Sequence, residues 1–529
     1  MSTKLKRTSL ASQAAIARFL QSARYAEQRW DHKEALENLG RARRLAPGNP
    51  DVLLQLGRIH GLFHDYAKAG DYFEKAVHFS KQKTLTLSQA GNIAGEFYDL
   101  DLCERYLRRA TEQQDATAET WLKLARYLEN ARQMPECIQC IEQAVRLDPA
   151  SIEIPFVLAQ VARQAGGWEE AEKLFRSVMT ATTDMWYRVQ CGYELGAVLD
   201  RQGRYDEAMA AFIEAKAPYQ SQTESFRYKR EALFVKWRRV LAGISAEVLQ
   251  RWSADGPQLR PARRLALLCG HPRSGTTLLE QVLDAHPDIV TAEETKTFFL
   301  EVCLPMAKAR PPEPDAADIT AFQLNFAAVE AAPVELLRRL RENYFRSMER
   351  CLGQPIGGRM VVDKNPALWL LISGFPRVFP EAKFLVALRD PRDVCLSCFT
   401  LNLPPTIEIQ RTSYFNLSDI VDKYVEEMTI WRTLAPLMQG RYLEVRYEDM
   451  VEDLESVARK TMDFLGVPWD PGVLRFHERA QQKVMSHMNY KDVSQPIYQR
   501  ARQRWRNYEK YFEPYQEKLA PFVKAFGYD

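Results

Sequence analysis

The stretch 265–281, LALLCGHPRSGTTLLEQ, decides the expected fold of the second half of this 529-residue chain. The mostly apolar run Leu265–Cys269 predicts a buried strand, and apolar residues at helical spacing from Leu278 onward predict a helix. Gly270 and Gly275, in the connection between them, allow the backbone to turn sharply. Backbone N–H groups and the positive end of the helix would then point into one concavity, which can hold an anion.

Side chains of this loop can add hydrogen bonds to a bound phosphate or sulfate; they are Arg273, Ser274, Thr276 and Thr277. The spacing of the glycines is that of a nucleotide-triphosphate P-loop, but Thr276 stands where that motif requires Lys. The simplest alternative is an ordinary strand-to-helix turn that happens to contain two glycines. A cation inside the loop and paired threonines at the helix start favour an anion site instead.

The run 272–278, PRSGTTL, resembles the 5′-phosphosulfate loop of sulfotransferases, and residues 283–295 are similar to the tyrosylprotein sulfotransferase branch. The match runs, with gaps, from about Leu265 to the C-terminus. It implies transfer of a sulfuryl group from 3′-phosphoadenosine 5′-phosphosulfate to a hydroxyl or phenol, possible acceptors including protein tyrosine. It also implies that the cofactor is bound by a loop made of Arg273, Ser274, Gly275, Thr276 and Thr277. No metal ion is expected to take part.

Three further segments, 359–366, 382–391 and 441–448, each predict a short buried strand that ends in polar residues. Strands that alternate with helices predict a parallel, doubly wound sheet, in which ligands collect beyond the carboxyl ends of the strands. Lys364 and Arg389 lie at two of these ends. We therefore expect a P-loop-like α/β sulfotransferase domain over residues 265–529.

Arg389 begins the run RDPRD, and Ser397 follows eight residues after it. This segment resembles the part of sulfotransferases that binds the 3′-phosphate. A cation at a strand end and a hydroxyl two helical turns along can converge on one phosphate group. The structural alternative is that Arg389 pairs with Asp390 or Asp393, but the phosphosulfate-like loop upstream favours cofactor binding.

The resemblance also assigns catalytic roles. Glu294 matches the general base of the family and follows another carboxylate, Glu293, on what we expect to be a loop. Lys364, together with Arg273, would neutralise the charge that builds on the bridging oxygen of the departing nucleotide. Two weaker matches near the nucleotide are Tyr447 and Ser486.

Some positions depart from the tyrosylprotein pattern. Asn365 stands where those enzymes have Asp, and Lys296 and Leu300 replace arginines that help to hold acidic peptide there. The acceptor therefore stays open among peptide, saccharide and small molecule. The C-terminal segments 494–498 and 504–508 resemble those of repeat-bearing sulfotransferases, although a Trp- and Arg-rich segment can equally serve packing.

Residues 16–220 repeat with a period of 34, as shown by Ala35, Ala69, Cys103, Cys137 and Ala171. A second register agrees: Ala42, Ala76, Ala110 and Ala144. This is the tetratricopeptide period, in which small residues let two antiparallel helices approach closely, and it predicts an α-solenoid of about six units. Its groove could bind a protein partner or the acceptor; the alternative is a purely structural array.

Residues 221–264 join the two parts. Basic residues alternate there with Leu233, Phe234 and Trp237, which predicts an amphipathic linker helix packed by its apolar side. The basic residues are most simply a solvated face, and a membrane-surface or acidic-partner role is the alternative. The first fifteen residues are expected to be a tail.

Composition excludes some classes of protein. A net charge of +3 argues against a general nucleic-acid binder. The basic N-terminus is followed by no apolar secretory core, and no apolar run reaches membrane-spanning length, so we expect a cytoplasmic protein. The nine cysteines are scattered and odd in number, and the Cys-x-x-Cys pairs at 137–140 and 395–398 lack a second ligand pair, so neither disulfides nor a metal are expected.

Two rival functions remain at this point. A phosphotransferase would bind the triphosphate of ATP with the same loop. That activity needs a lysine at position 276, where this chain has Thr276, and an acidic Mg²⁺ ligand, and neither is evident. A repeat scaffold with an inactive enzyme domain is the rival without catalysis. The sequence leaves the oligomeric state open.

Overall fold

The computed structural model describes residues 10–28, 31–97, 99–259, 263–308, 326–402, 414–482 and 501–529. The chain forms two compact units, the first ending at Ala181 and the second beginning at Thr182. No described helix combines the length and the apolar character that a membrane span requires.

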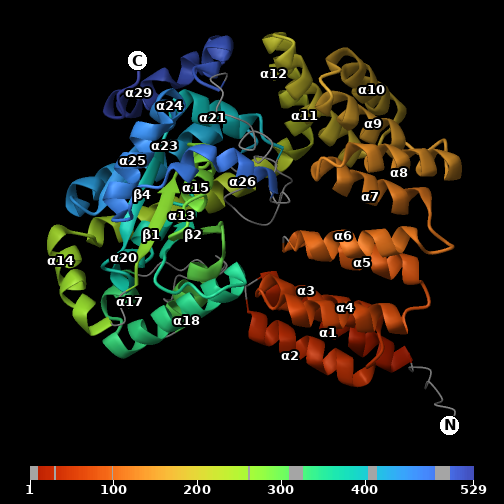
Figure 1. The fold of residues 1–529 in the computed structure, drawn as a ribbon, viewed down its shortest axis with the longest axis horizontal. Coiled ribbons are helices and arrows are strands. Elements are labelled where there is room, and N and C mark those ends of the chain that lie inside the picture. The colour runs from red at the N-terminus through yellow and green to blue at the C-terminus, as the bar shows by residue number, and fades with distance from the viewer. Residues whose placement is uncertain are drawn as a thin grey trace. The chain divides into compact units, whose positions relative to one another are not determined.

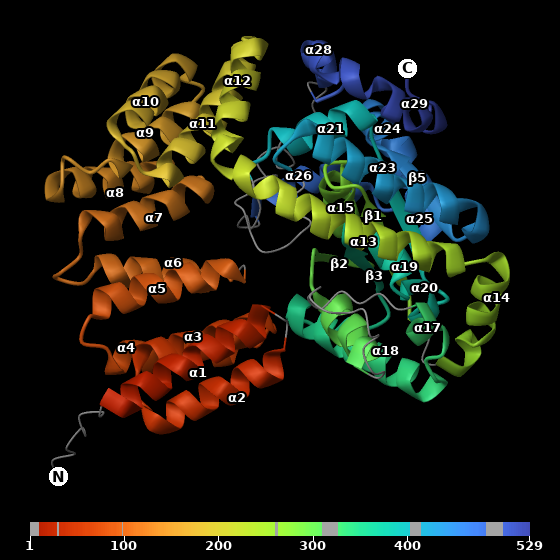
Figure 2. The same cartoon turned by 180° about the vertical axis from the view of Figure 1, so that it is seen from behind.

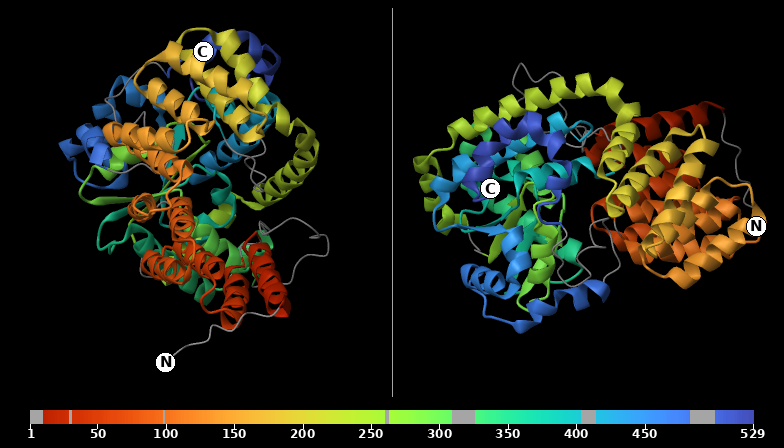
Figure 3. Two further views of the ribbon diagram at one scale, coloured as in Figure 1. Left: turned by 90° about the vertical axis from the view of Figure 1, so that its right-hand side faces the viewer. Right: turned by 90° about the horizontal axis from the view of Figure 1, so that it is seen from above.

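The first unit is a series of antiparallel helical pairs, drawn in red to orange in Figure 1 and seen from other directions in Figure 3. Its helices are α1 (Leu10–Gln28), α2 (His32–Leu45), α3 (Pro50–Leu62), α4 (Tyr66–Phe79), α5 (Lys83–Glu96), α6 (Leu100–Thr111), α7 (Ala118–Asn130), α8 (Met134–Leu147), α9 (Glu153–Gln164) and α10 (Trp168–Ala181). The predicted helical repeats are therefore confirmed.

Small residues bring the two helices of each pair together. A Cβ atom added to Gly57 on α3 would lie 2.4 Å from the Phe73 ring on α4, and one added to Gly91 on α5 would lie 2.9 Å from Leu107 on α6. The 34-residue register of small side chains is buried at the same crossings, with Ala35 and Ala69 fully inaccessible. Because the interior is close-packed, larger residues at these positions would push the helices apart.

A sixth helical pair, α11 (Met185–Arg201) and α12 (Tyr205–Lys216), belongs to the second unit. It is followed by η1 (Ala217–Gln222), α13 (Thr223–Gly243), α14 (Ala246–Ala254) and η2 (Gly256–Leu259). On α13, Arg227 and Arg230 pair with Asp419 at 2.8 and 3.1 Å. Part of the basic face that the sequence suggested was solvated is thus engaged with carboxylates of the same unit.

The second unit contains a five-stranded sheet in the order β2-β3-β1-β4-β5, with every neighbouring pair parallel. The strands are β1 (Leu265–Gly270), β2 (Ile289–Glu293), β3 (Met360–Lys364), β4 (Lys383–Leu388) and β5 (Tyr442–Arg446). The predicted parallel sheet is confirmed. Strand β2 was not foreseen, and Glu293, expected on a loop, is its last residue.

Helices cover both faces of this sheet, α15 and α25 on the side toward the viewer in Figure 1 and α13, α19 and α23 on the side shown in Figure 2. The remaining elements are α15 (Thr276–Asp284), η3 (Phe299–Cys303), α16 (Leu304–Lys308), α17 (Phe326–Glu330), α18 (Val334–Leu352), α19 (Trp369–Ile372), α20 (Phe375–Val378), α21 (Pro391–Phe399), α23 (Leu417–Leu434), η4 (Ala435–Met438), α24 (Tyr447–Glu452), α25 (Leu454–Leu465), η5 (Pro471–Arg475), α26 (Phe476–Gln482), η6 (Arg504–Tyr508), α28 (Glu509–Phe512), η7 (Glu513–Tyr515) and α29 (Gln516–Ala525).

One hydrophobic core of the second unit lies on the α15 and α25 side, and strand residues of the other face, such as Leu267 and Phe384, are equally buried. This core is built from alternate residues of β1 and β4, such as Leu268 and Leu385, packed against Leu279 and Met462 of the covering helices. Strand β1 is central. Strands β3 and β2 lie on one side of it, and after β3 the chain crosses to β4 on the other side. In parallel sheets a ligand site forms at such a switch point, beyond the carboxyl ends of the strands. The loop 270–277 leaves β1 at that point.

Candidate active site

The loop between β1 and α15 needs both of its glycines. Gly270 has φ 143° and Gly275 has φ 93°, conformations that residues with a side chain rarely adopt. A Cβ atom on Gly270 would lie 2.5 Å from the Ala387 carbonyl oxygen, and one on Gly275 would lie 2.8 Å from the Tyr447 ring. The glycines therefore allow both the turn and the close packing of the loop against β4 and α24.

The N-terminus of α15 suits an anion. Gly275 is its N-cap residue and provides no side-chain cap, and the first turn holds no acidic residue. Ser274 and Thr276 are almost completely buried beside it. The first N–H groups of a helix lack partners within the helix and carry its partial positive charge, so they favour a bound phosphate or sulfate. Thr277 lies in the same first turn.

Arg273 connects the loop to the segment after β4. Its φ of 74° is left-handed, which is uncommon for a residue with a long side chain. Its Nε donates a hydrogen bond of 2.9 Å to Oγ of Ser397 on α21, and its carbonyl oxygen accepts one of 3.2 Å from Arg389. Three predicted site residues from two separate parts of the sequence thus meet in one place.

Arg389 lies directly after β4 with an almost buried guanidinium group. It donates a 2.6 Å hydrogen bond to the Ala501 carbonyl oxygen and lies 4.8 Å from the centre of the Tyr447 ring. Its Nε has no hydrogen-bond partner among the described residues. Buried polar groups are usually paired, so this donor is suited to a ligand atom.

The structural alternative for Arg389 is only partly realised. Asp393 approaches it no closer than 3.9 Å and instead accepts a 2.8 Å hydrogen bond from the backbone N–H of Trp505. Burial raises the pKa of Asp393 to about 6. Asp390 pairs with Arg392 at 2.7 Å, so it does not neutralise Arg389. The Arg389 charge is therefore incompletely compensated by its own segment.

Glu294 and Lys364 follow neighbouring strands and contact each other. Nζ of Lys364 lies 2.7 Å from Glu294 Oε1 and 3.3 Å from Glu293 Oε1, and the Glu294 N–H donates to the Lys364 carbonyl oxygen at 2.7 Å. The Lys364 side chain is 1% exposed, whereas that of Glu294 is 42% exposed. Burial alone would lower the pKa of this ammonium group, but neighbouring carboxylates, Glu294 the strongest, raise it above its ordinary value.

Glu294 also has a left-handed backbone, with φ 45°. Such conformations cost free energy and persist where the surroundings impose them, often at functional sites. Here the pairing of β2 with β3 ends at Glu293 and Lys364, and the hydrogen bond from the Glu294 N–H extends it by one step. The turn directs Glu294 to the accessible side, while the Glu293 side chain is 16% exposed.

Buried groups around these residues were missed by sequence reasoning. Asp363 precedes Lys364 on β3 and accepts a 2.7 Å hydrogen bond from the Tyr344 hydroxyl, and burial raises its pKa to about 7. Glu280 on α15 is 2% exposed and accepts a 2.9 Å hydrogen bond from Thr291. A carboxylate within an apolar helical run was the signal that could have identified Glu280.

Helix α23 also contacts the loop 270–277. Fully buried His271 contacts its own neighbour through Nδ1, 2.8 Å from the Pro272 carbonyl oxygen, and places Nε2 3.4 Å from Glu427. Burial lowers the pKa of His271 to about 4, so the ring is neutral near pH 7. The Cys398 thiol lies 3.7 Å from the same carbonyl oxygen. Nothing in the local sequence predicted these contacts.

The remaining predicted residues have different outcomes. Ser486 and the segment 494–498 lie outside the described residues. Tyr447 contacts both the loop and Arg389, as described above. Trp505 is buried against the guanidinium group of Arg392, which lies 3.9 Å from its ring centre, so segment 504–508 packs against the Arg389 segment. Among the described residues, no group of three or more His, Cys, Asp or Glu is arranged to hold a metal ion.

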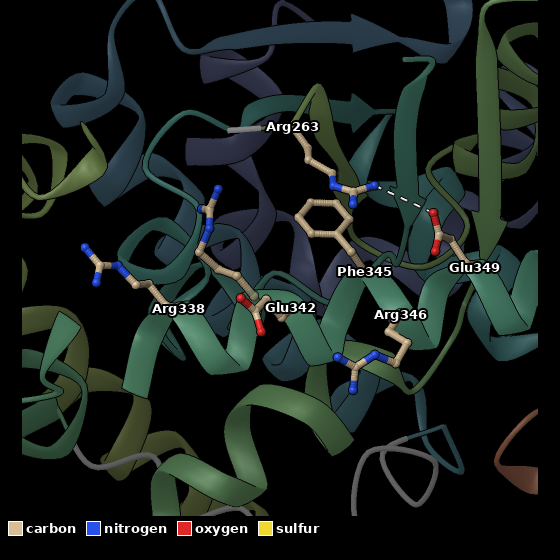
Figure 4. Close-up of a pocket in the computed structure, with 7 residues that line it drawn as sticks. Arg263, Arg338, Glu342, Phe345, Arg346 and Glu349 are labelled. Atoms are coloured by element: carbon tan, nitrogen blue, oxygen red, sulfur yellow. Dashed lines mark ion pairs between the residues drawn. The ribbon is translucent and has the colours of Figure 1, made fainter. Parts of the chain in front are cut away.

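A hollow on α18 lies apart from this constellation (Figure 4). It is lined by Arg263, Arg338, Arg341, Glu342, Phe345, Arg346 and Glu349. Arg263 lies just before β1, and hence at the opposite end of that strand from the loop. The guanidinium groups of Arg338 and Arg346 point in different directions in Figure 4, and Glu349 lies 3.7 Å from Arg263. This hollow contains none of the predicted site residues.

Comparison with known proteins agrees with the two kinds of unit. Residues 266–471 match the family model described as the sulfotransferase family, and residues 20–83 and 118–151 match tetratricopeptide repeat models. Protein-tyrosine sulfotransferase 1 of Danio rerio is 28% identical over 225 residues, which cover 40% of this chain and 56% of the fish protein.

Other relatives extend further along the chain. An uncharacterized protein of Aquifex aeolicus (strain VF5) is 24% identical over 421 residues, which cover 78% of this chain and 52% of that protein. The chain thus spans about half the length of these two relatives. Among solved structures, the sulfotransferase domain of the Synechococcus PCC 7002 olefin synthase is 21% identical, covering 51% of this chain and 97% of that domain, with a TM-score of 0.35. Residues 266–471 are therefore similar to the sulfotransferase family, and residues 20–83 and 118–151 are similar to tetratricopeptide repeats.

Proposed function

We propose that this protein transfers a sulfuryl group from 3′-phosphoadenosine 5′-phosphosulfate to a hydroxyl or phenol acceptor. The observation that carries the proposal is the contact of 2.9 Å between Arg273 and Ser397. It joins a loop suited to the 5′-phosphosulfate with a segment suited to the 3′-phosphate, and a donor with two separate phosphate-bearing positions requires both.

The residues fit this donor. The N–H groups at the start of α15, with Ser274, Thr276 and Thr277, would hold the 5′-phosphosulfate. Arg389 and Ser397 would hold the 3′-phosphate, and the unpaired Nε of Arg389 supports this role. When bound, the nucleotide supplies an activated sulfuryl group.

Glu294 would act as the base. It accepts the proton of the acceptor hydroxyl while the new O–S bond forms and the bond from sulfur to the bridging oxygen breaks. The electron pair of that bond stays on the bridging oxygen, where Lys364 and Arg273 neutralise the negative charge. The Lys364 ammonium group lies 2.7 Å from the Glu294 carboxylate, so it must leave this contact in order to bind the bridging oxygen.

The acceptor, the partner and the cellular location are also proposals. We propose a cytoplasmic enzyme because the nine cysteines are all unpaired and most are buried, as is usual in a reducing compartment. Because one of the relatives is a protein-tyrosine sulfotransferase, a tyrosine peptide is one candidate acceptor, beside a saccharide or a small molecule. The repeats 16–220 would bind the acceptor or a protein partner, and residues 221–264 would link them to the catalytic domain 265–529.

Thermal-shift titration tests the donor site. Adenosine 3′,5′-bisphosphate at 100 times its dissociation constant should stabilise the protein by about 2.7 kcal/mol. Arg389→Ala should weaken the binding of adenosine 3′,5′-bisphosphate more than that of adenosine 5′-phosphate, because the proposed ligand contact of Arg389 is with the 3′-phosphate. An equal loss for both nucleotides would contradict the role of Arg389, and stabilisation by ATP with Mg²⁺ alone would favour phosphotransfer.

A further inference from the structure

Tyr528, which follows α29 (blue in Figure 1), is held at the start of α24. Its hydroxyl donates a 2.6 Å hydrogen bond to Oε2 of Glu448 on that helix. Cζ of Arg446 lies 4.4 Å from the centre of its ring, and Arg446 donates a 3.1 Å hydrogen bond to the neighbouring Gly527 carbonyl oxygen. Burial and the charge of Glu448 raise the pKa of this phenol far above its ordinary value, so it remains a hydrogen-bond donor.

The other oxygen of Glu448 holds the turn that carries Arg389. The backbone N–H of Asp390 donates a 3.2 Å hydrogen bond to Glu448 Oε1. Glu448 is 8% exposed, so little water competes for these two hydrogen bonds. Because both of its oxygens are engaged, one carboxylate fixes the backbone beside Arg389 and is itself fixed by Tyr528.

Tyr447, the residue before Glu448, lies between the two predicted phosphate-binding segments. Its ring centre is 4.8 Å from the Arg389 guanidinium group. The same ring packs on the loop 270–277, where a Cβ atom on Gly275 would lie 2.8 Å from it. The loop is thus supported by the Tyr447 ring, whereas the Arg389 turn depends also on the Glu448 hydrogen bond. Loss of the Glu448 contacts should therefore affect the 3′-phosphate site while the loop keeps its support.

Arg392, three residues after Arg389, is held by the same part of the chain. Its guanidinium group lies over the ring of Trp505 on η6, 3.9 Å from the ring centre. It also donates a hydrogen bond to the Asp529 carbonyl oxygen. The segment that begins at Arg389 is therefore fixed from η6 and from the residues after α29 together.

We propose that Glu448 and Tyr528 are positioning residues for the 3′-phosphate: Tyr528 fixes the Glu448 carboxylate, and Glu448 fixes the turn that aims Arg389. The inference rests on the proposed sulfuryl transfer, because it takes the 3′-phosphate of the donor as the ligand of Arg389. A guanidinium group binds an oxyanion tightly when its orientation is set in advance, since less freedom is lost on binding. The pair therefore determines how strongly the site prefers a nucleotide with a 3′-phosphate over one without it.

Calorimetric titration of the full chain with adenosine 3′,5′-bisphosphate and with adenosine 5′-phosphate tests this. Tyr528→Phe removes only the hydroxyl, so the dissociation constant of the bisphosphate should rise by about 3- to 10-fold, the effect of one hydrogen bond. The dissociation constant of adenosine 5′-phosphate should change by less than about twofold. Tyr511→Phe is the matched control, because the Tyr511 hydroxyl also donates to a carboxylate, that of Asp206 at 3.3 Å, but this carboxylate lies on α12. It should leave both dissociation constants unchanged.

Glu448 provides the second test. Glu448→Gln and Glu448→Ala remove the same charge, but only glutamine keeps an acceptor for the Asp390 N–H and a donor to the Tyr528 oxygen. The preference for the bisphosphate should therefore be about 3- to 10-fold lower in Glu448→Ala than in Glu448→Gln. Adding Tyr528→Phe to Glu448→Ala should have no further effect, because Tyr528 acts through Glu448.

The preference of the wild type for the bisphosphate decides between the two levels of proposal. If the wild type prefers the bisphosphate and Tyr528→Phe keeps that preference, this inference is overturned while the proposed function stands. An equal loss of affinity for both nucleotides also overturns it, because a purely structural defect would weaken both, and so does an equal preference of the two Glu448 variants. Should Glu448→Ala fail to fold, Tyr528→Phe alone decides. If the wild type shows no preference for the bisphosphate, this inference and the proposed sulfuryl donor are both overturned.

Discussion

Glu293 and Glu294 are adjacent in the sequence but differ in their suitability as a general base. The β2–β3 pairing includes Glu293, whose side chain is 16% exposed, while the left-handed backbone at Glu294 turns the next carboxylate outward. A base must reach both the acceptor and its own counter-charge. Only Glu294 combines a 2.7 Å contact with Lys364 and an accessible carboxylate.

Glu294→Gln should lower turnover by about 10²- to 10⁴-fold, because an amide cannot accept the proton. The affinity for adenosine 3′,5′-bisphosphate should be preserved, since none of the proposed phosphate contacts is made by Glu294 itself. Glu293→Gln is the matched control and should lose much less activity. Single-turnover rates and nucleotide titrations measure the two effects, and equal losses of rate from both variants would place the base elsewhere.

Elements show where prediction from sequence succeeds and where it stops. The loop 270–277 and the helical repeats were predicted because glycines, hydroxyls and small residues at fixed spacing act locally. Strand β2 was missed because Ile289–Glu293 is short and has only three apolar residues, and it becomes a strand by pairing with β3. Likewise the contacts of His271 with Glu427 and of Lys216 with Tyr414 join distant segments, so no local pattern could predict them.

Strand β3 carries a pH-dependent contribution to stability. Burial raises the pKa of Asp363 to about 7, above that of an exposed carboxyl near 3.9. Between these pH values the folded state holds a proton that the unfolded state has released, so this group lowers the free energy of unfolding as pH rises from about 4 to 7. The upper limit is roughly 1.4 kcal/mol per pKa unit of the difference.

Asp363→Asn should remove this dependence, because the amide cannot ionise and its oxygen can still accept the Tyr344 hydroxyl. The melting temperature of the variant relative to the wild type should therefore increase as pH rises from about 4 to 7. Thermal unfolding in a pH series measures the difference. A constant difference across that range would show that Asp363 does not titrate in the folded protein.

At the scale of the whole molecule, the sequence and the structure divide the chain at different places. The repeat period assigns α11 and α12 to the solenoid, whereas they form one compact unit with the α/β domain that contains the sheet. Their contacts within that unit are specific: Asp200 on α11 pairs with Arg504 at 2.9 Å, and Gln190 accepts a hydrogen bond of 2.6 Å from Asn402. The periodicity of a helix pair records how its helices pack on each other and does not reveal which unit they join.

Two truncations distinguish these divisions. A fragment that begins at Thr182 keeps α11 and α12, so it should fold, bind adenosine 3′,5′-bisphosphate and sulfate a simple phenol. If the repeats bind the native acceptor, this fragment should lose rate on that acceptor chiefly through KM, because remote contacts supply binding while Arg273, Glu294 and Lys364 are all retained. Unchanged kinetics on the native acceptor would instead assign the repeats a structural or partner-binding role.

A fragment that begins at Phe226 lacks α11 and α12 and should be much less stable. It leaves the Tyr414 carbonyl oxygen without Lys216 and exposes Phe399, over which Lys216 lies at 4.7 Å. A buried acceptor that loses its donor costs about 1–3 kcal/mol, and the loss of several such contacts approaches the whole stability of a domain. Melting temperatures and solubility of the two fragments provide the measurement. If the Phe226 fragment is as stable as the Thr182 fragment and has the same kinetics with the phenol, the sixth helical pair contributes neither to the stability of the domain nor to catalysis.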